Sequence, residues 1–233
     1  MNHYQLHAGA YLSPTPAGAY FAASNQAQEV ARMFLFKLMS NDATPRSSME
    51  LLRQWLPSTP DVQIMELLYR MQQLGWIQGE RGRRDAPQGS LETVLPGLLK
   101  QLSSSDKVLL ADNAGFYVCN LGYPHETAEE LSALSADIGN LYERHKGLLA
   151  RNLGVRSEAW AIVNAAGSSE IGVWPLHIGS VRFSLIISGL SLFNQPAFTD
   201  LVWALSLRYA EAPEAIDQLG LNNAPSPSRC EQV

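Results

Sequence analysis

Residues 109–122 read LLADNAGFYVCNLG, and this stretch decides the fold of the carboxyl-terminal half of the chain. Two apolar runs, 107–111 and 116–121, flank Asp112-Asn113-Ala114-Gly115, which is a strong turn signal. The pattern predicts two short antiparallel strands joined by a tight turn. Gly122-Tyr123-Pro124 then ends the second strand.

A long helix is predicted next, over residues 127–149. Thr127 and Glu130 have the spacing of a capping box, which satisfies backbone N–H groups of the first helical turn. Apolar residues then recur at alternating intervals of three and four, a spacing that suits close packing against a second helix. This seam consists of Leu131, Leu134, Ile138, Leu141, His145 and Leu148. Ala128, Tyr142 and Leu149 broaden the stripe, so the helix is also compatible with covering a sheet.

The elements on either side of this unit complete a domain over residues 90–212. A helix is predicted over 91–102, where leucines mark one face. Three strand-like runs follow the long helix, and a last helix begins after Asn194-Gln195-Pro196. The expected order is helix, strand, strand, helix, three strands, helix. We expect residues 213–233, which end in APSPSRCEQV, to be a flexible tail.

The first part of the chain has a different pattern. Helical spacing predicts three short helices, within 26–40, 49–56 and 60–74, and a strand with a basic turn follows at 76–84. We assign these to a module of residues 25–86, which the polar stretch RDAPQGS separates from the second domain. Residues 1–24 repeat Ala-Gly-Ala-Tyr around Ser13-Pro14-Thr15-Pro16 and are read as a hairpin or flexible arm.

Composition excludes several classes of protein. Hydrophobic residues make up 46% of the 233 and charged residues 17%, which is typical of a globular chain. The apolar runs are too short to span a bilayer, and the amino terminus lacks the cations of a signal peptide, so we expect a cytoplasmic protein with no membrane partner. Residues 1–89 carry a net charge of +1 and the rest −6, and neither value fits a dedicated nucleic-acid-binding domain.

The order of elements from 91 to 212, together with the hairpin LLADNAGFYVCNLG and the long helix, resembles the roadblock/LC7 family. The resemblance covers a little over half of the chain and rests on a pattern rather than on catalytic residues. It implies a homodimer in which two long helices pack together and the third strands pair into one continuous sheet. The implied dimer face is then the seam Leu131, Leu134, Ile138, Leu141, His145 and Leu148, with Trp160 and Ile162 on the third strand. It also implies protein binding, with a small Ras-like GTPase among the expected partners.

The module of residues 25–86 resembles a winged helix-turn-helix domain. This resemblance admits DNA binding as an alternative, with Arg70 on the third helix and Arg81, Arg83 and Arg84 in the wing as candidate contacts. The third helix has no other cation to read bases or bind phosphates, and Asp61 and Glu66 lie beside Arg70. Protein binding therefore fits the charge of this module better than DNA binding.

The motifs of common enzymes are not found in the sequence. The five histidines do not form a His-x-x-x-His or His-Glu-x-x-His pair, and phosphate-binding glycine loops and a Gly-x-Ser-x-Gly elbow are also missing. We predict no catalytic residue, no cofactor and no metal site. The expected fold is α+β, a winged-helix-like helical module followed by a roadblock-like α-β-β-α-β-β-β-α domain with an antiparallel sheet. The expected function is that of a non-enzymatic, homodimeric regulatory scaffold, and a DNA-binding transcription regulator is the alternative.

Overall fold

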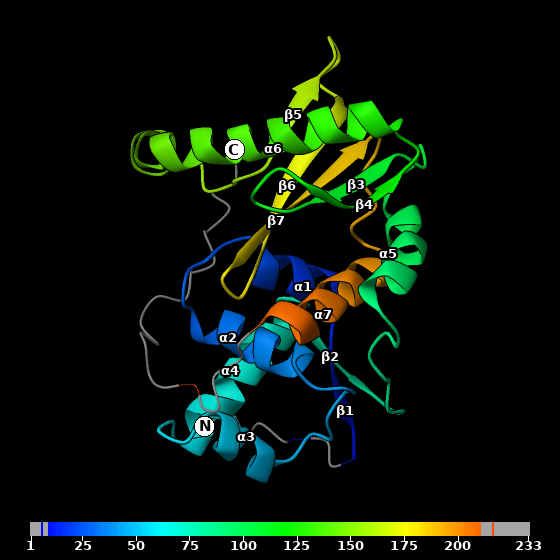
Figure 1. Ribbon diagram of the computed structural model, residues 1–233. Helices are drawn as coiled ribbons and strands as arrows, with labels where there is room; N and C mark the ends of the chain where they lie inside the picture. The colour runs from blue at the N-terminus through cyan, green and yellow to red at the C-terminus, as the bar shows by residue number, and fades with distance from the viewer. Residues whose placement is uncertain (1–5, 7–8, 211–215, 217–233) are drawn as a thin grey trace.

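A computed structural model describes residues 6, 9–210 and 216. The amino-terminal part contains two strands and four helices, and the carboxyl-terminal part a sheet of five strands with helices on both faces (Figure 1). The elements are β1 (Tyr11–Pro14), α1 (Pro16–Ala23), α2 (Val30–Met39), α3 (Met49–Trp55), α4 (Asp61–Gln73) and β2 (Ile77–Glu80), then α5 (Leu91–Leu99), the short 3-10 helix η1 (Lys100–Leu102), β3 (Val108–Ala111), β4 (Tyr117–Leu121), α6 (His125–Gly147), the π-helical turn η2 (Leu148–Asn152), β5 (Trp160–Val163), β6 (Ser169–Ile178), β7 (Val181–Ser188) and α7 (Pro196–Tyr209).

The five-stranded sheet has the order β4-β3-β7-β6-β5, and every neighbouring pair is antiparallel. The mixed helix and sheet content with an antiparallel sheet is as predicted. The hairpin between β3 and β4 forms where the sequence places it. The Asp112 carboxylate accepts hydrogen bonds from the backbone N–H groups of Ala114 and Phe116, and Gly115 takes a positive φ of 88°. All residues that form this turn lie within five positions of one another, so the turn can be predicted from the sequence alone.

Helices cover both faces of this sheet. Leu109, Ala111 and Ile186 point to the face that α6 covers, where they pack with Ala128. Alternate residues such as Leu110 and Leu185 point to the opposite face and join the main core. That face is covered by α1 and α7, with α5 beside them (Figure 1). The helix α7 is buried almost all round because it lies between the sheet and the amino-terminal helices.

The amino-terminal part is built from α2, α3 and α4 and a small group of extended segments. Ser48 caps α3 by accepting a hydrogen bond from the Leu51 N–H, and Gly75 follows α4 with a φ of 67°, as a C-cap glycine does. β1 pairs antiparallel with β2. The backbone around Thr44 bonds to Arg84 on the returning chain.

The reading of residues 1–24 as a hairpin or arm is wrong for the residues that the structure describes. Residues 11–14 form β1, which pairs with β2 from the other end of the module, and residues 16–23 form α1. Thr15 caps α1 and Pro16 occupies its first turn. Ala19 and Ala22 are fully buried, so the alanine-rich composition reflects close helix packing rather than flexibility.

One hydrophobic core runs through both parts of the chain. At their junction the Arg84 guanidinium bonds to Asp200 at 2.5 Å, and the Trp203 indole N–H donates to the Asn41 carbonyl at 2.9 Å. Most of the predicted flexible tail lies outside the described residues. Ile216 is described, and it differs from that prediction because it is fully buried and its N–H bonds to the Trp55 carbonyl.

Gly18 is required where α1 passes the end of α4. A Cβ at this position would overlap the carbonyl oxygen of Trp76, a backbone atom of the segment that leads from α4 into β2. We expect Gly18→Ala to lower the free energy of unfolding by about 1–3 kcal/mol, measured by urea denaturation. Gly97→Ala in α5 is the matched control, because its Cβ would meet open space and alanine favours a helix by up to about 1 kcal/mol. Equal effects of the two substitutions would contradict the close approach of α1 to Trp76.

Candidate protein–protein interface

The helix α6 turns its small residues toward the sheet. Ala128, Ser132 and Ser135 are buried, and Tyr142 is the only bulky residue that the helix buries. The two serine hydroxyls donate to backbone carbonyls within the helix, at 2.7 Å to Ala128 and 2.8 Å to Ser132. Buried hydroxyls are thus satisfied without partners from the sheet, and the helix can lie close against the strands.

The predicted seam of α6 lies on its outer side. Leu134, Leu141 and Leu148 are 47%, 41% and 50% exposed. His145 is also exposed and Ile138 is partly buried, whereas Leu131 packs against the core between α6 and the sheet. Leu134, Leu141 and Leu148 therefore point away from this chain's own core, whereas Leu131 and Tyr142 contribute to it. A row of exposed leucines at seven-residue intervals is the pattern of a helix that packs against another helix.

The strand β5 continues this apolar surface. It lies at the edge of the sheet and pairs with β6 alone, so the backbone groups of its other side have no strand partner among the described residues. Trp160 and Ile162 stand opposite Val173 and Ile171, which pack on the α6 face of the sheet. Residues that face each other across strands share a face, so Trp160 and Ile162 lie on the same side as α6. Ile162 is 62% exposed.

The helix α6 covers only part of its face of the sheet. It packs on β3, β4 and β7, and β5 and β6 extend beyond it (Figure 1). The predicted interface residues thus belong to the α6 side of the sheet, one group on α6 and η2 and the other on β5, and Leu131 among them packs against the core. We call this surface, made of Leu131, Leu134, Ile138, Leu141, His145, Leu148, Trp160 and Ile162, the α6–β5 surface.

Comparisons with known proteins give likenesses to solved structures alone. No family model matches the sequence, and no curated protein matches it. A roadblock/LC7 domain from Streptomyces avermitilis is 12% identical, with a TM-score of 0.33, over 52% of this chain and 93% of that one. MglB from Myxococcus xanthus is 16% identical, with a TM-score of 0.30, over 53% and 89%. The gliding protein MglB from Thermus thermophilus is 17% identical, with a TM-score of 0.33, over 52% and 91%.

About half of the chain is therefore similar to roadblock/LC7 domain proteins of known structure. Identities and TM-scores this low carry no argument about function.

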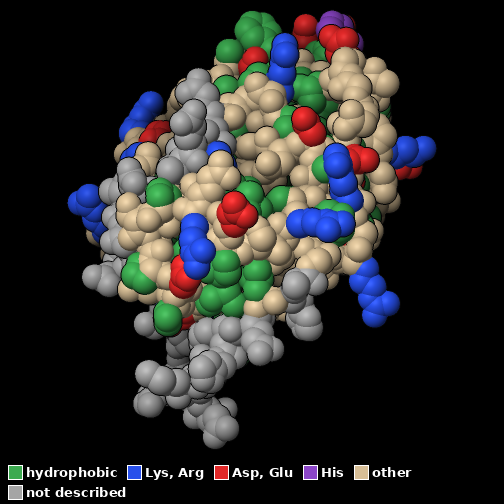
Figure 2. Space-filling view, turned by 90° about the horizontal axis from the view of Figure 1, so that it is seen from below, with side chains coloured by type: hydrophobic (Ala, Val, Ile, Leu, Met, Phe, Trp, Pro, Cys, Tyr) green, Lys and Arg blue, Asp and Glu red, His purple; other side chains and the backbone are tan. Residues whose placement is uncertain are grey.

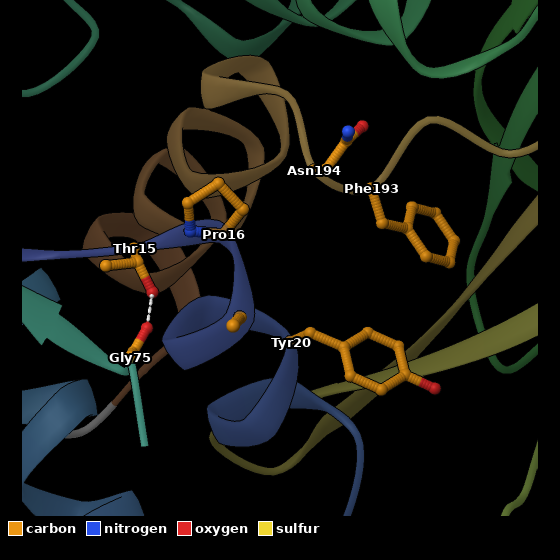
Figure 3. Close-up of a pocket in the computed structure, with 7 residues that line it drawn as sticks. Thr15, Pro16, Tyr20, Gly75, Phe193 and Asn194 are labelled. Carbon is orange, nitrogen blue, oxygen red and sulfur yellow. Dashed lines mark hydrogen bonds between the residues drawn. The ribbon is translucent and has the colours of Figure 1, made fainter. Parts of the chain in front are cut away.

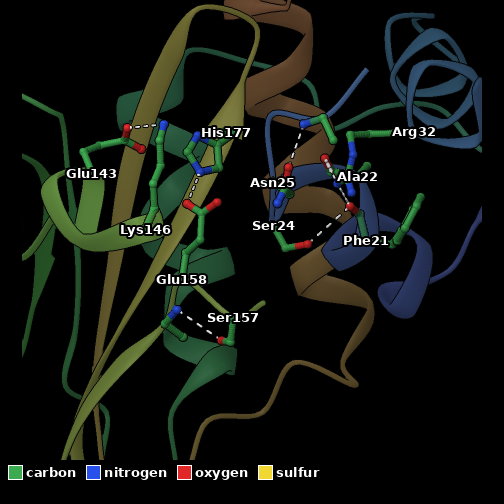
Figure 4. Close-up of polar contacts among 12 residues, drawn as sticks. Phe21, Ala22, Ser24, Asn25, Arg32, Glu143, Lys146, Ser157, Glu158 and His177 are labelled. Carbon is green, nitrogen blue, oxygen red and sulfur yellow. Dashed lines mark hydrogen bonds and ion pairs between the residues drawn. The ribbon is translucent and has the colours of Figure 1, made fainter. Parts of the chain in front are cut away.

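A buried pair that the sequence does not reveal holds the start of β5. The His177 Nε2 and the Glu158 Oε2 lie 2.8 Å apart, and both side chains are largely buried (Figure 4). Glu158 comes two residues before β5, and His177 lies on the neighbouring strand β6. The pair thus ties the loop after α6 to the sheet and fixes where the edge strand begins. The sequence pattern places His177 in a strand, but no spacing relates it to Glu158.

A second buried polar side chain, Arg32 on α2, holds the end of α1. Its guanidinium bonds to the carbonyls of Phe21 and Ala22 at the end of α1, where helical carbonyls lack partners, and it lies 4.4 Å from the centre of the Phe21 ring (Figure 4). Burial lowers the pKa of Arg32, and the negative charges of Glu29 and Glu158 oppose that change. Arg32 therefore acts as a structural cap for α1.

Three of the four candidate nucleic-acid contacts have carboxylate partners. Arg70 pairs with Glu66 at 2.6 Å, Arg83 with Asp85 at 3.1 Å, and Arg84 with Asp200 at 2.5 Å. Arg81 is exposed and forms no ion pair with a described carboxylate. Basic and acidic side chains are interspersed on the face shown in Figure 2, which is the underside of the view in Figure 1. This arrangement does not form the continuous basic stripe that a DNA backbone attracts.

The described residues also offer little for catalysis. They contain no group of three or more His, Cys, Asp or Glu side chains placed to hold a metal ion. No described helix combines the length and apolar character needed to cross a membrane. A cavity of about 450 Å³ lies between α1 and the loop before α7 (Figure 3). Its walls are Thr15, Pro16, Ala17, Tyr20, Gly75, Phe193 and Asn194. The Thr15 hydroxyl is already engaged, because it donates to the Gly75 carbonyl.

Proposed function

We propose that this chain is a non-enzymatic, homodimeric regulatory scaffold that dimerises through the α6–β5 surface. The observation that carries the proposal is the exposed row of leucines on α6, which continues onto an open edge strand. In a two-fold dimer the same surface faces itself, so α6 packs against the partner's α6 and β5 pairs with the partner's β5. Both the exposed apolar area and the unpaired strand edge are then covered at once.

The dimer presents two copies of each remaining surface to a protein partner. The resemblance to roadblock/LC7 domains implies a small Ras-like GTPase as that partner, and we propose this class. The helices α2, α3 and α4 with β2, and the bonding of residues 42–44 to 84–86, support a winged-helix-like module over residues 25–86. We propose that this module makes protein contacts, because Arg70, Arg83 and Arg84 are already paired with carboxylates.

Affinity capture from a native lysate of the source organism tests the partner class. The full chain is immobilised, and bound proteins and nuclease-sensitive DNA are both quantified. We expect enrichment of a small GTPase or another regulatory protein, reduced when Leu134→Asp and Ile138→Asp are introduced together to give a monomer. The Arg81→Gln variant is the control and should capture the same protein. Recovery of DNA without a protein partner, lost in the Arg81→Gln variant, would contradict the scaffold and favour a transcription regulator.

A further inference from the structure

The end of α6 and the loop after it concentrate positive charge in an acidic protein. Residues 144–157 read RHKGLLARNLGVRS, and they contain four Lys or Arg, one His and no Asp or Glu. The rest of the chain keeps 13 of the 17 Lys and Arg against all 22 Asp and Glu. We call residues 144–157 the basic tip. Glu143 and Glu158 flank the tip and line one hollow with Lys146 and Arg151. With these two carboxylates counted, residues 143–158 still carry a net charge of +2 in a chain of −5, so the local field is opposite in sign to that of the whole molecule.

Three of the four Lys and Arg side chains of the basic tip form no ion pair with a described carboxylate. Arg144, Arg151 and Arg156 form no ion pair with a described carboxylate, whereas Lys146 pairs with Glu143 at 2.7 Å. All residues of the tip except Leu149 are exposed. The charges of Arg144, Arg151 and Arg156 are therefore available to an external anion.

Apolar side chains are exposed among these cations. Leu153 is 63% exposed, and Val155 is exposed beside it. The backbone holds them in a compact turn: the Leu153 N–H bonds to the Leu148 carbonyl at 3.2 Å, the Val155 N–H bonds to the Leu149 carbonyl at 2.9 Å, and Gly154 takes a φ of 67°. The end of α6 that carries this turn extends beyond the strands of the sheet (Figure 1). The turn is thus preformed and unobstructed by the sheet.

We propose that the basic tip binds peripherally to a membrane surface that contains anionic lipids. Arginines attract the lipid phosphates, and Leu153 and Val155 enter the boundary between headgroups and acyl chains, as the apolar residues of interfacial segments do. The tip has no Phe, Tyr or Trp on which bases can stack, so a nucleic acid fits it less well. The apolar runs of the sequence are too short to span a bilayer, but binding at the membrane surface does not require a spanning run.

His145 and Leu148 belong to both the basic tip and the proposed dimer face, but the residues that carry this inference do not. Arg151, Leu153, Val155 and Arg156 lie beyond the last residue of the α6 seam, Leu148.

Flotation of the full chain with vesicles tests the proposal. One set of vesicles is phosphatidylcholine alone, and the other contains phosphatidylglycerol in addition. We expect binding to the anionic vesicles that weakens as salt is added. Arg151→Gln with Arg156→Gln should weaken the partition coefficient by about 30-fold, since each cation near an anionic surface contributes about a factor of five. Leu153→Ser with Val155→Ser should reduce the binding that remains at high salt.

The matched control removes the same charge elsewhere. Arg81→Gln with Arg83→Gln takes two exposed cations from the amino-terminal module and should leave vesicle binding unchanged. Equal binding to both kinds of vesicle, or equal loss in the two double variants, would overturn the proposal. Binding to duplex DNA that disappears with Arg151→Gln and Arg156→Gln, without binding to vesicles, would overturn it too. The mass of each variant by light scattering separates a lost dimer from lost lipid binding.

Discussion

Leu134→Asp together with Ile138→Asp is expected to convert the proposed dimer into a monomer. Each copy contributes both aspartates to the centre of the α6 seam, so a symmetric dimer would bury four charges without partners. An unpaired buried charge costs about 3 kcal/mol or more, which weakens association by more than about 100-fold per site. Sedimentation equilibrium of wild type and variant at matched concentrations measures the change.

The same substitutions should leave the single chain folded. Leu134 is half exposed and Ile138 lies at the edge of α6, so water solvates the new carboxylates in a monomer. Thermal unfolding followed by circular dichroism checks that the variant is folded. Val62→Asp is the control, because Val62 is exposed on α4, in a separate part of the chain from α6. An unchanged dissociation constant in the seam variant, or an equal change in Val62→Asp, would rule out this interface.

Trp203→Ala is expected to lower the free energy of unfolding by about 3–5 kcal/mol. The indole is fully buried in α7, its N–H bonds to the Asn41 carbonyl, and the Arg84 guanidinium lies 5.9 Å from its ring centre. Removing it leaves a cavity and an unpaired carbonyl at the junction of the two parts of the chain. A typical domain is stable by about 5–15 kcal/mol, so this single change removes a large share. Urea denaturation measures the loss.

Two further substitutions separate the contributions of the indole. Trp203→Phe keeps a buried ring but loses the N–H, so its effect should be smaller than that of Trp203→Ala. Leu207→Ala lies on the same helix with a partly exposed side chain and should cost about 1 kcal/mol or less. A loss from Trp203→Ala as small as that from Leu207→Ala would contradict the role of α7 as the shared core of both parts.

The free energy of unfolding should depend on pH through Asp200, which pairs with Arg84 where the two parts of the chain meet. Burial raises the pKa of Asp200, and the Arg84 guanidinium opposes that rise. A carboxyl whose pKa is higher in the folded than in the unfolded state binds its proton more tightly when folded. Its ionisation therefore destabilises the fold as pH rises through the folded pKa, and Arg84 limits the loss.

The parts of the fold that could be predicted depend on local signals. Asp112 and Gly115 specify the turn of the β3–β4 hairpin whatever the rest of the chain does. The seam of α6 is also local, because helical periodicity alone places Leu134, Ile138 and Leu141 on one side. Periodicity does not say whether that side faces the sheet or solvent. The structure settles this, because the small residues Ala128, Ser132 and Ser135 occupy the inner face.

The parts that sequence reasoning missed are made by residues far apart in the chain. β1 pairs with β2 some 60 residues later, at Tyr11 opposite Glu80 and Pro14 opposite Ile77, so nothing near residue 11 indicates a strand. The pairing of Glu158 with His177 and of Arg84 with Asp200 is similarly remote. Burial of Ile216 depends on the carbonyl of Trp55, which no pattern in the tail reports.

The mass of the unaltered chain in solution, measured by light scattering across a concentration series, tests the central claim most directly. A homodimer through the α6–β5 surface predicts a mass of about twice 25.6 kDa that falls toward 25.6 kDa on dilution. A mass of 25.6 kDa at every concentration would contradict the claim, because the exposed leucines of α6 and the open edge of β5 would then remain uncovered.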